Sequence, residues 1–121
     1  MSRLFSLLLL ALLGGCHQAY FGTINIGADA PLVEARSVVY DAERDLAIDI
    51  YRATDAPANA PLILFFYGGS WNRGDRETYR FVGHALAARG CLVAVADYRL
   101  YPQVRYPDFL RDGARALAWT R

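Results

Sequence analysis

An unbroken apolar run that stops at two glycines constrains this chain most. Residues 62–67 read Leu-Ile-Leu-Phe-Phe-Tyr and are followed by Gly68 and Gly69. Such a run is typical of a strand buried on both faces of a parallel sheet. Glycine permits backbone conformations that other residues avoid, and it lets the chain pass close to a ligand. Because a helical pattern begins behind Asp75, the stretch predicts a strand, a glycine turn with free amides and a helix, which together can bind an anion.

A family resemblance favours this binding interpretation over a simple tight exit from a strand. Residues 67–71 read Tyr-Gly-Gly-Ser-Trp and residues 74–75 read Gly-Asp, which resembles the His-Gly-Gly-Gly-type loop of α/β-hydrolase esterases. Residues 97–102, Asp-Tyr-Arg-Leu-Tyr-Pro, resemble a second block of that family. The two blocks stand in the family's order, and the resemblance covers roughly residues 37–121. Two departures are Tyr67 in place of the usual His and Gln103 in place of a common Glu.

The resemblance implies an α/β architecture, the N-terminal part of an α/β-hydrolase fold, truncated before the nucleophile elbow. An antiparallel strand pair is expected at residues 37–40 and 46–51, followed by a βαβα unit with a parallel sheet. The second strand of the pair alternates apolar and polar residues, as a half-exposed edge would. Strands at residues 62–67 and 92–96 should then lie side by side in parallel, because a right-handed helical crossover joins them.

Two helices complete the expected unit. The first should span residues 76–89 and end at Gly90. The second should begin at Pro107-Asp108, with proline at its first position and an acid near the positive end of the helix dipole. Its apolar face is predicted to carry Leu110, Ala114, Leu117 and Ala118.

The resemblance also implies a role in acyl transfer. It assigns the oxyanion-hole amides to Gly69 and Ser70, with Gly68 allowing the turn. The nucleophile of this fold sits in a G-x-S-x-G elbow, and no such sequence occurs here. We do not take Ser37 or Ser70 as the nucleophile. The intact relative is expected to hydrolyse a small carboxylic ester without a metal or organic cofactor. This chain lacks the Ser nucleophile, the acid and the His, and is predicted to be inactive alone.

Several other polar residues have a structural and a catalytic interpretation. Asp97 follows a strand at the edge where α/β sites gather, but we favour a structural knot in which Asp97 and Arg99 satisfy local charges. For His84 we favour helix packing or a surface position over catalysis. Tyr98 and Tyr101 are as suited to packing the loop as to lining a pocket, and so is Tyr106.

The N-terminus predicts export. Residues 1–15 resemble a lipoprotein-type signal peptide, with Arg3 before an apolar run of about ten residues that is too short to cross a bilayer. The run ends in Leu-Gly-Gly-Cys, which resembles a bacterial lipobox and predicts lipidation of Cys16. The alternative is ordinary signal cleavage near Ala19. We therefore expect a lipid-anchored protein of the bacterial cell envelope, with a tether over residues 16–35 and a partial domain over residues 36–121.

Charge balance and residue spacing give no support for several other functions. The chain has 13 basic residues, all arginine, against 12 acidic ones, so removing Arg3 with the signal leaves no net charge. This balance gives no support for nucleic-acid binding. The two histidines, His17 and His84, are too far apart for a metal-ligand motif. If Cys16 is lipidated, Cys91 has no disulfide partner and is expected to be a small buried apolar residue.

Two other classes of function remain open from the sequence. The Gly-Gly-x-Trp pattern with Gly74-Asp75 also resembles arylformamidases, and peptidases of the prolyl-oligopeptidase kind share the architecture. The other class is a catalytically inactive surface lipoprotein. The coding sequence after Arg121 would discriminate them, since a G-x-S-x-G motif followed by late Asp and His favours the esterase class.

Overall fold

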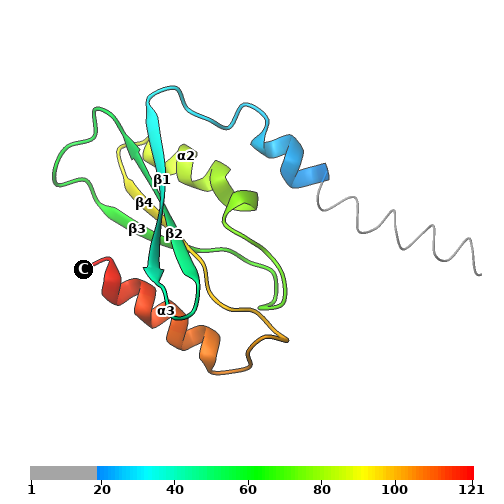
Figure 1. Ribbon diagram of the computed structural model, residues 1–121. Coiled ribbons are helices and arrows are strands. Elements are labelled where there is room, and N and C mark those ends of the chain that lie inside the picture. Colours follow the sequence, from blue (N-terminus) through cyan, green and yellow to red (C-terminus); the bar gives the residue numbers. More distant parts are fainter. Residues whose placement is uncertain (1–18) are drawn as a thin grey trace, which may run out of the picture.

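The fold is a four-stranded mixed sheet with helices on both faces (Figure 1). The computed structural model describes residues 19–121, so the predicted signal peptide and Cys16 lie outside the described residues. The strand order is β1-β2-β4-β3, in which β1 pairs antiparallel with β2, β2 antiparallel with β4, and β3 parallel with β4. The strands are β1 (Val33–Asp41), β2 (Leu46–Ala53), β3 (Leu62–Phe66) and β4 (Leu92–Ala96).

The centre of the sheet is β4, whose alternating side chains divide the core in two. Val93 and Val95 are fully buried on the face that η1 (Glu77–Tyr79) and α2 (Arg80–Ala87) cover. Ala94 and Ala96 are fully buried on the opposite face, against α3 (Asp108–Trp119). The core is divided in this way because successive residues of a strand point to opposite faces. The small alanine side chains let α3 approach the sheet closely.

Two sequence predictions about the strands are wrong. The strand buried on both faces is β4, whereas Leu62 and Phe66 at the ends of β3 are 43% and 40% exposed. Within residues 19–121, β3 has a strand partner on one side only. The strand predicted as an edge, β2, lies between β1 and β4. The alternating pattern of β2 correctly indicated that one of its faces is polar. Polar side chains can also stand on an inner strand if other elements pair with them, and the sequence of one strand does not show such partners.

The first helical region has the predicted capping contact and glycine stop, but its first turn is not α-helical. The chain enters as the 3₁₀ turn η1 before α2, where a single helix over residues 76–89 was expected. The Asp75 carboxylate accepts a hydrogen bond from the Thr78 amide at 2.7 Å, the capping contact expected of it. Gly90 has φ +89°, which is the left-handed geometry that ends a helix.

The apolar face predicted for α3 does not face the sheet. Leu110 and Leu117 are 52% and 47% exposed, and Ala114 and Ala118 are exposed as well. The buried side of α3 instead carries Asp112 and Ala116. Asp112 turns inward because Arg99, at the end of the sheet, pairs with it. The Arg99–Asp112 ion pair and Ala116 thus mark the side of α3 that meets the described sheet.

Residues 16–35, expected to be a tether, pack on the domain where the structure describes them. Residues 19–25 are helical, and the Asn25 side chain donates to the Thr78 carbonyl at 3.0 Å and accepts from the Phe81 amide at 3.2 Å. The segment then runs into β1, which starts at Val33. These contacts offset the entropy lost when the segment is ordered. No helix within residues 19–121 is long and apolar enough to cross a membrane.

His84 packs the same segment onto α2. The imidazole is buried, its Nδ1 accepts from the Ala30 amide at 3.2 Å, and its Nε2 lies 3.3 Å from Asp29 Oδ1. The ring also meets the Tyr51 ring edge-on at 5.1 Å between centroids. The helix-packing interpretation of His84 is therefore confirmed.

Candidate active site

The loop after β3 has an unusual backbone. Gly69 has φ +137°, and Ser70 and Trp71 have φ +55° and +57°. Non-glycine residues rarely adopt left-handed angles, and two in succession are costly. A Cβ on Gly69 would lie 2.0 Å from the Arg73 carbonyl oxygen, so no side chain fits there. The turn was predicted at Gly68, whereas the positive φ that requires glycine is at Gly69.

Contacts from the second sequence block hold the strained residues. The Trp71 carbonyl accepts a hydrogen bond from the Tyr101 amide at 2.7 Å. The Trp71 ring stacks on Phe109, at the start of α3, with centroids 5.6 Å apart and planes at 24°. Strained residues of this kind persist only when their surroundings determine them, and they gather at functional sites. The sequence indicated that Trp71 belongs to a motif. It did not indicate that Trp71 contacts Phe109, which lies 38 residues further along the chain.

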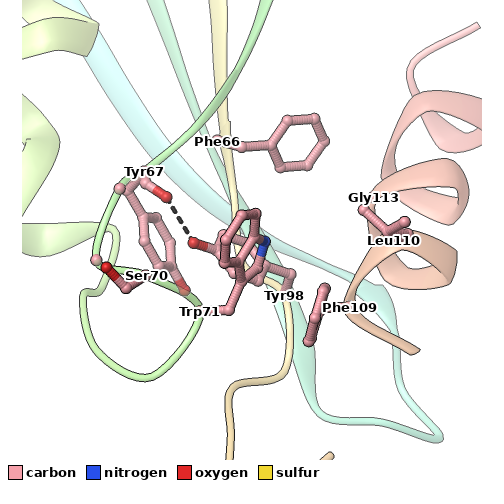
Figure 2. Close-up of a pocket in the computed structure, with 10 residues that line it drawn as sticks. Phe66, Tyr67, Ser70, Trp71, Tyr98, Phe109, Leu110 and Gly113 are labelled. Atoms are coloured by element: carbon pink, nitrogen blue, oxygen red, sulfur yellow. Dashed lines mark hydrogen bonds between the residues drawn. The ribbon is translucent and has the colours of Figure 1, made fainter. Parts of the chain in front are cut away.

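The two candidate oxyanion amides are available for a ligand. In the described part of the chain, neither the Gly69 nor the Ser70 amide donates a hydrogen bond to another protein group. Both residues border a cavity of about 420 Å³ between the loop and α3 (Figure 2). The cavity lining is largely apolar, and consists of Phe66, Tyr67, Gly68, Gly69, Ser70, Trp71, Tyr98, Phe109, Leu110 and Gly113.

Two stacked tyrosines line the cavity beside the glycine loop. Tyr67 and Tyr98 are both buried, with ring centroids 4.8 Å apart, and the Tyr98 hydroxyl donates to the Tyr67 carbonyl at 2.6 Å (Figure 2). Burial and the nearby Asp97 carboxylate raise the pKa of the Tyr67 hydroxyl above its ordinary value. Tyr98 therefore both packs the loop and lines the cavity, while Tyr101 and Tyr106 are 50% and 74% exposed.

Asp97 and Arg99 each take part in a separate polar cluster. Asp97 accepts from the Tyr67 hydroxyl at 3.2 Å and from Arg76 Nε at 2.7 Å. Arg99 instead pairs with Asp112. Asp97 and Arg99 thus both satisfy charges near the loop, as the structural interpretation predicted, and they do so through separate partners. Arg76 is a site residue that the sequence did not indicate, because its partners come from several distant strands.

Arg76 is a junction of charges below the loop. Besides Asp97, its guanidinium contacts Asp49 of β2, and it donates to the Ser37 hydroxyl of β1 at 3.0 Å. Partial burial disfavours the charged form, but the bonds to the two carboxylates outweigh burial and raise the pKa of Arg76. Ser37, one of the two serines considered as nucleophiles, is therefore part of this junction.

No nucleophile–base pair forms among the described residues. Ser70 lies at the cavity, whereas His84 contacts residues 29–30 and Tyr51 on the α2 face. Residues 19–121 also contain no cluster of three or more His, Cys, Asp or Glu side chains that could hold a metal ion. What the arrangement offers chemically is a pair of amide donors beside an apolar cavity.

The fold and the loop together define a class of protein. Esterase B from Lactobacillus rhamnosis superposes with a TM-score of 0.73 at 21% identity, over 98% of this chain and 40% of that one. Esterase 2 from Thermogutta terrifontis superposes with a TM-score of 0.64 at 30% identity, over 71% of this chain and 35% of that one. The sheet of order β1-β2-β4-β3 with a glycine loop after β3 is thus the N-terminal part of an α/β-hydrolase fold.

Sequence comparison identifies the family within that class. A profile of the BD-FAE family matches residues 48–121, which is more than half of the chain. The chain belongs to this family of α/β-hydrolases. It is also 35% identical over 89 residues to carboxylesterase NlhH of Mycobacterium tuberculosis, which covers 72% of this chain. The chain spans only 28% of the length of that relative.

Proposed function

We propose that this chain is part of a hydrolase of carboxylic esters, in which Gly69 and Ser70 supply amides of the oxyanion hole. The observation that carries the proposal is that these two amides have no acceptor in the described chain and border an apolar cavity. In ester hydrolysis, negative charge develops on the carbonyl oxygen, and a preorganised donor at that point lowers the barrier by about 3 kcal/mol. The cavity beside the amides suits the apolar part of a small ester.

The named relatives favour an ester over an amide as substrate. One is a carboxylesterase, and a rice protein, 37% identical over 84 residues, is named a probable isoprenylcysteine alpha-carbonyl methylesterase. The rice match covers 69% of this chain and 20% of that protein. Since both names describe ester hydrolysis, ester chemistry is the proposal to test first.

The nucleophile and its base would come from outside residues 19–121. Ser37 is engaged with Arg76, and Ser70 is followed by Trp71 and Asn72, so the final Gly of a G-x-S-x-G nucleophile elbow is missing. His84 is held by the N-terminal segment. Residues 17–121 alone are therefore expected to show no turnover above background.

We further propose that the protein is exported and held at a membrane by a lipid on Cys16.

The test compares the complete gene product with residues 17–121, using p-nitrophenyl acetate as substrate. The complete product should hydrolyse it, and Gly69→Pro should lower kcat at least about 100-fold, because proline removes an amide that matters once charge has formed and because neither its Cβ nor its fixed φ fits the turn at Gly69. A loss confined to KM would contradict the oxyanion role. Turnover by residues 17–121 that disappears in Ser70→Ala would show that Ser70 is the nucleophile, and would overturn the assignment.

A further inference from the structure

A single carboxylate binds both ends of the glycine loop. Asp97 Oδ1 accepts from the hydroxyl of Tyr67, the residue before Gly68, at 3.2 Å. Asp97 Oδ2 accepts from Nε of Arg76, the residue after Asp75, at 2.7 Å. The segment between these two contacts is residues 68–75, which includes both candidate oxyanion amides. The two ends of the loop are thus fixed relative to one another through one side chain.

The carboxylate itself is fixed by the sheet. Asp97 directly follows β4, and its amide donates to the Ala47 carbonyl of the neighbouring β2 at 2.9 Å. Phe66 and Ala96 are register partners in the parallel β3–β4 pair, so Tyr67 and Asp97 leave the sheet together. Because Arg76 also contacts Asp49 of β2 and Ser37 of β1, the far end of the loop is bound to these two strands as well.

The glycine loop needs contacts outside residues 68–75 to keep its conformation. Ser70 and Trp71 are both in left-handed geometry, which is unfavourable for residues that carry a Cβ. Within described residues 68–75, the backbone hydrogen bond internal to the loop is the one from the Asn72 amide to the Gly69 carbonyl, at 3.2 Å. One such bond contributes less than two left-handed residues cost. It cannot by itself hold the strained turn, so external contacts must decide whether the amides stay in place.

We infer that Asp97 clamps the glycine loop, and that Tyr67, Asp97 and Arg76 are positioning residues for the Gly69 and Ser70 amides. The inference rests on the proposed function for its catalytic consequence. Tyr67 stands where the resembling esterase loop usually has His, and from this position its hydroxyl reaches the carboxylate. Freed from the clamp, the loop would sample other conformations, and fewer molecules would present both amides to the cavity.

Substitution of Tyr67 by Phe isolates the clamp from packing. The ring would keep its stacking on Tyr98, at 4.8 Å, and on Tyr79, at 6.0 Å, and would lose only the hydroxyl. Tyr40 offers a matched control. Its hydroxyl donates to the main-chain carbonyl of Asp97 and touches neither carboxylate oxygen. Tyr40→Phe therefore removes a hydroxyl bond to the same residue and leaves the clamp intact.

The catalytic test uses the complete gene product and p-nitrophenyl acetate. Tyr67→Phe should lower kcat about 5-fold and Asp97→Ala about 50-fold, with KM within about twofold in both, because only transition-state stabilisation depends on the amides. Tyr40→Phe should stay within about twofold of the wild type. In the Asp97→Ala background, Tyr67→Phe should add nothing, since its partner is already gone. Additive effects, or equal losses in Tyr67→Phe and Tyr40→Phe, would overturn the clamp while leaving the proposed function standing.

A structural measurement on the same proteins does not depend on activity. Hydrogen exchange of the Asn72 amide, followed by NMR, should be about 10-fold faster in Tyr67→Phe than in the wild type and unchanged in Tyr40→Phe. If the wild type shows no esterase activity but this pattern appears, the proposed function fails and the clamp stands. Unchanged exchange in Tyr67→Phe would overturn the clamp. If Asp97→Ala does not fold, the comparison of Tyr67→Phe with Tyr40→Phe decides alone.

Discussion

Arg99 and Asp112 form a bidentate ion pair, in which Arg99 Nε and Nη2 donate to the two carboxylate oxygens at 2.8 Å each. The Arg99 amide donates to Asp112 Oδ2 as well, at 3.1 Å, and Arg115 Nη1 donates to Oδ1 at 2.9 Å. The Asp112 side chain is fully buried. This pair joins the segment after β4 to α3, and so sets where Phe109 stands against Trp71.

The pair predicts a loss of stability in acid. Burial alone would favour the neutral Asp112 carboxyl, but the hydrogen bonds from Arg99 outweigh burial and lower the pKa of Asp112 below its ordinary value. A lowered folded-state pKa contributes stability above the unfolded-state pKa, near 3.9, that is lost as pH falls through the folded-state value. Urea denaturation of the complete gene product should therefore show Asp112→Asn to be about 3 kcal/mol less stable at pH 7, and the deficit should shrink below about pH 4.

Asp108 supplies the control for this measurement. It lies on the same helix and pairs with Arg111 at 2.9 Å, but both side chains are substantially exposed. Asp108→Asn should change stability at pH 7 by less than about 0.5 kcal/mol. Equal losses in Asp108→Asn and Asp112→Asn would contradict the special role of the buried pair.

Two helical glycines should respond to alanine in opposite directions. A Cβ on Gly83 would lie 2.3 Å from the buried Tyr51 ring, so Gly83→Ala should push α2 from the sheet and cost about 1–3 kcal/mol. A Cβ on Gly113 would lie 3.6 Å from Phe66, an ordinary contact, so Gly113→Ala should gain up to about 1 kcal/mol of helix propensity. Thermal unfolding of the two variants checks this. Changes of the same sign would contradict the packing argument.

Residues 17–121 alone should self-associate. Within the described residues, the outer edge of β3 has no strand partner, and exposed apolar side chains flank it, including Leu62, Phe66, Leu110 and Trp119. An unpaired apolar edge is a template for pairing with another chain. Size-exclusion chromatography with circular dichroism tests the prediction.

A pair of lysine substitutions locates the contact. Leu62→Lys, on β3, should reduce self-association, because a charge on an edge strand opposes pairing. Val39→Lys, at an exposed position of β1 on the other side of the sheet, should not. A monodisperse wild-type monomer with a cooperative thermal transition would show that four strands suffice.

Lipidation of Cys16 stays a prediction from the sequence, since Cys16 lies outside the described residues. Labelled palmitate should enter the protein in a bacterial host, and Cys16→Ala should abolish the label, because only the cysteine of the lipobox carries the lipid. Label that survives the substitution would rule the lipobox out. Ordinary cleavage near Ala19 would then be the remaining interpretation.

The sequence by itself determined the features that depend on neighbours along the chain. The apolar run ending at Gly68, the Asp75 cap and the Gly90 stop are local signals, because each acts through backbone geometry or a contact within a few residues. The parallel pairing of β3 and β4 followed from the length and hand of the crossover.

The tertiary structure alone decided how the polar side chains pair and which faces are buried. Asp97 and Arg99 are near neighbours in sequence, yet each finds its partner elsewhere, in Arg76 and in Asp112. Periodicity placed Leu110 toward the core, but within the described residues Leu110 borders the cavity with Phe66, and the side of α3 that meets the sheet carries the buried Asp112. A charge enters the interior only where a partner from a distant segment meets it, so its position depends on the assembled fold and not on local pattern.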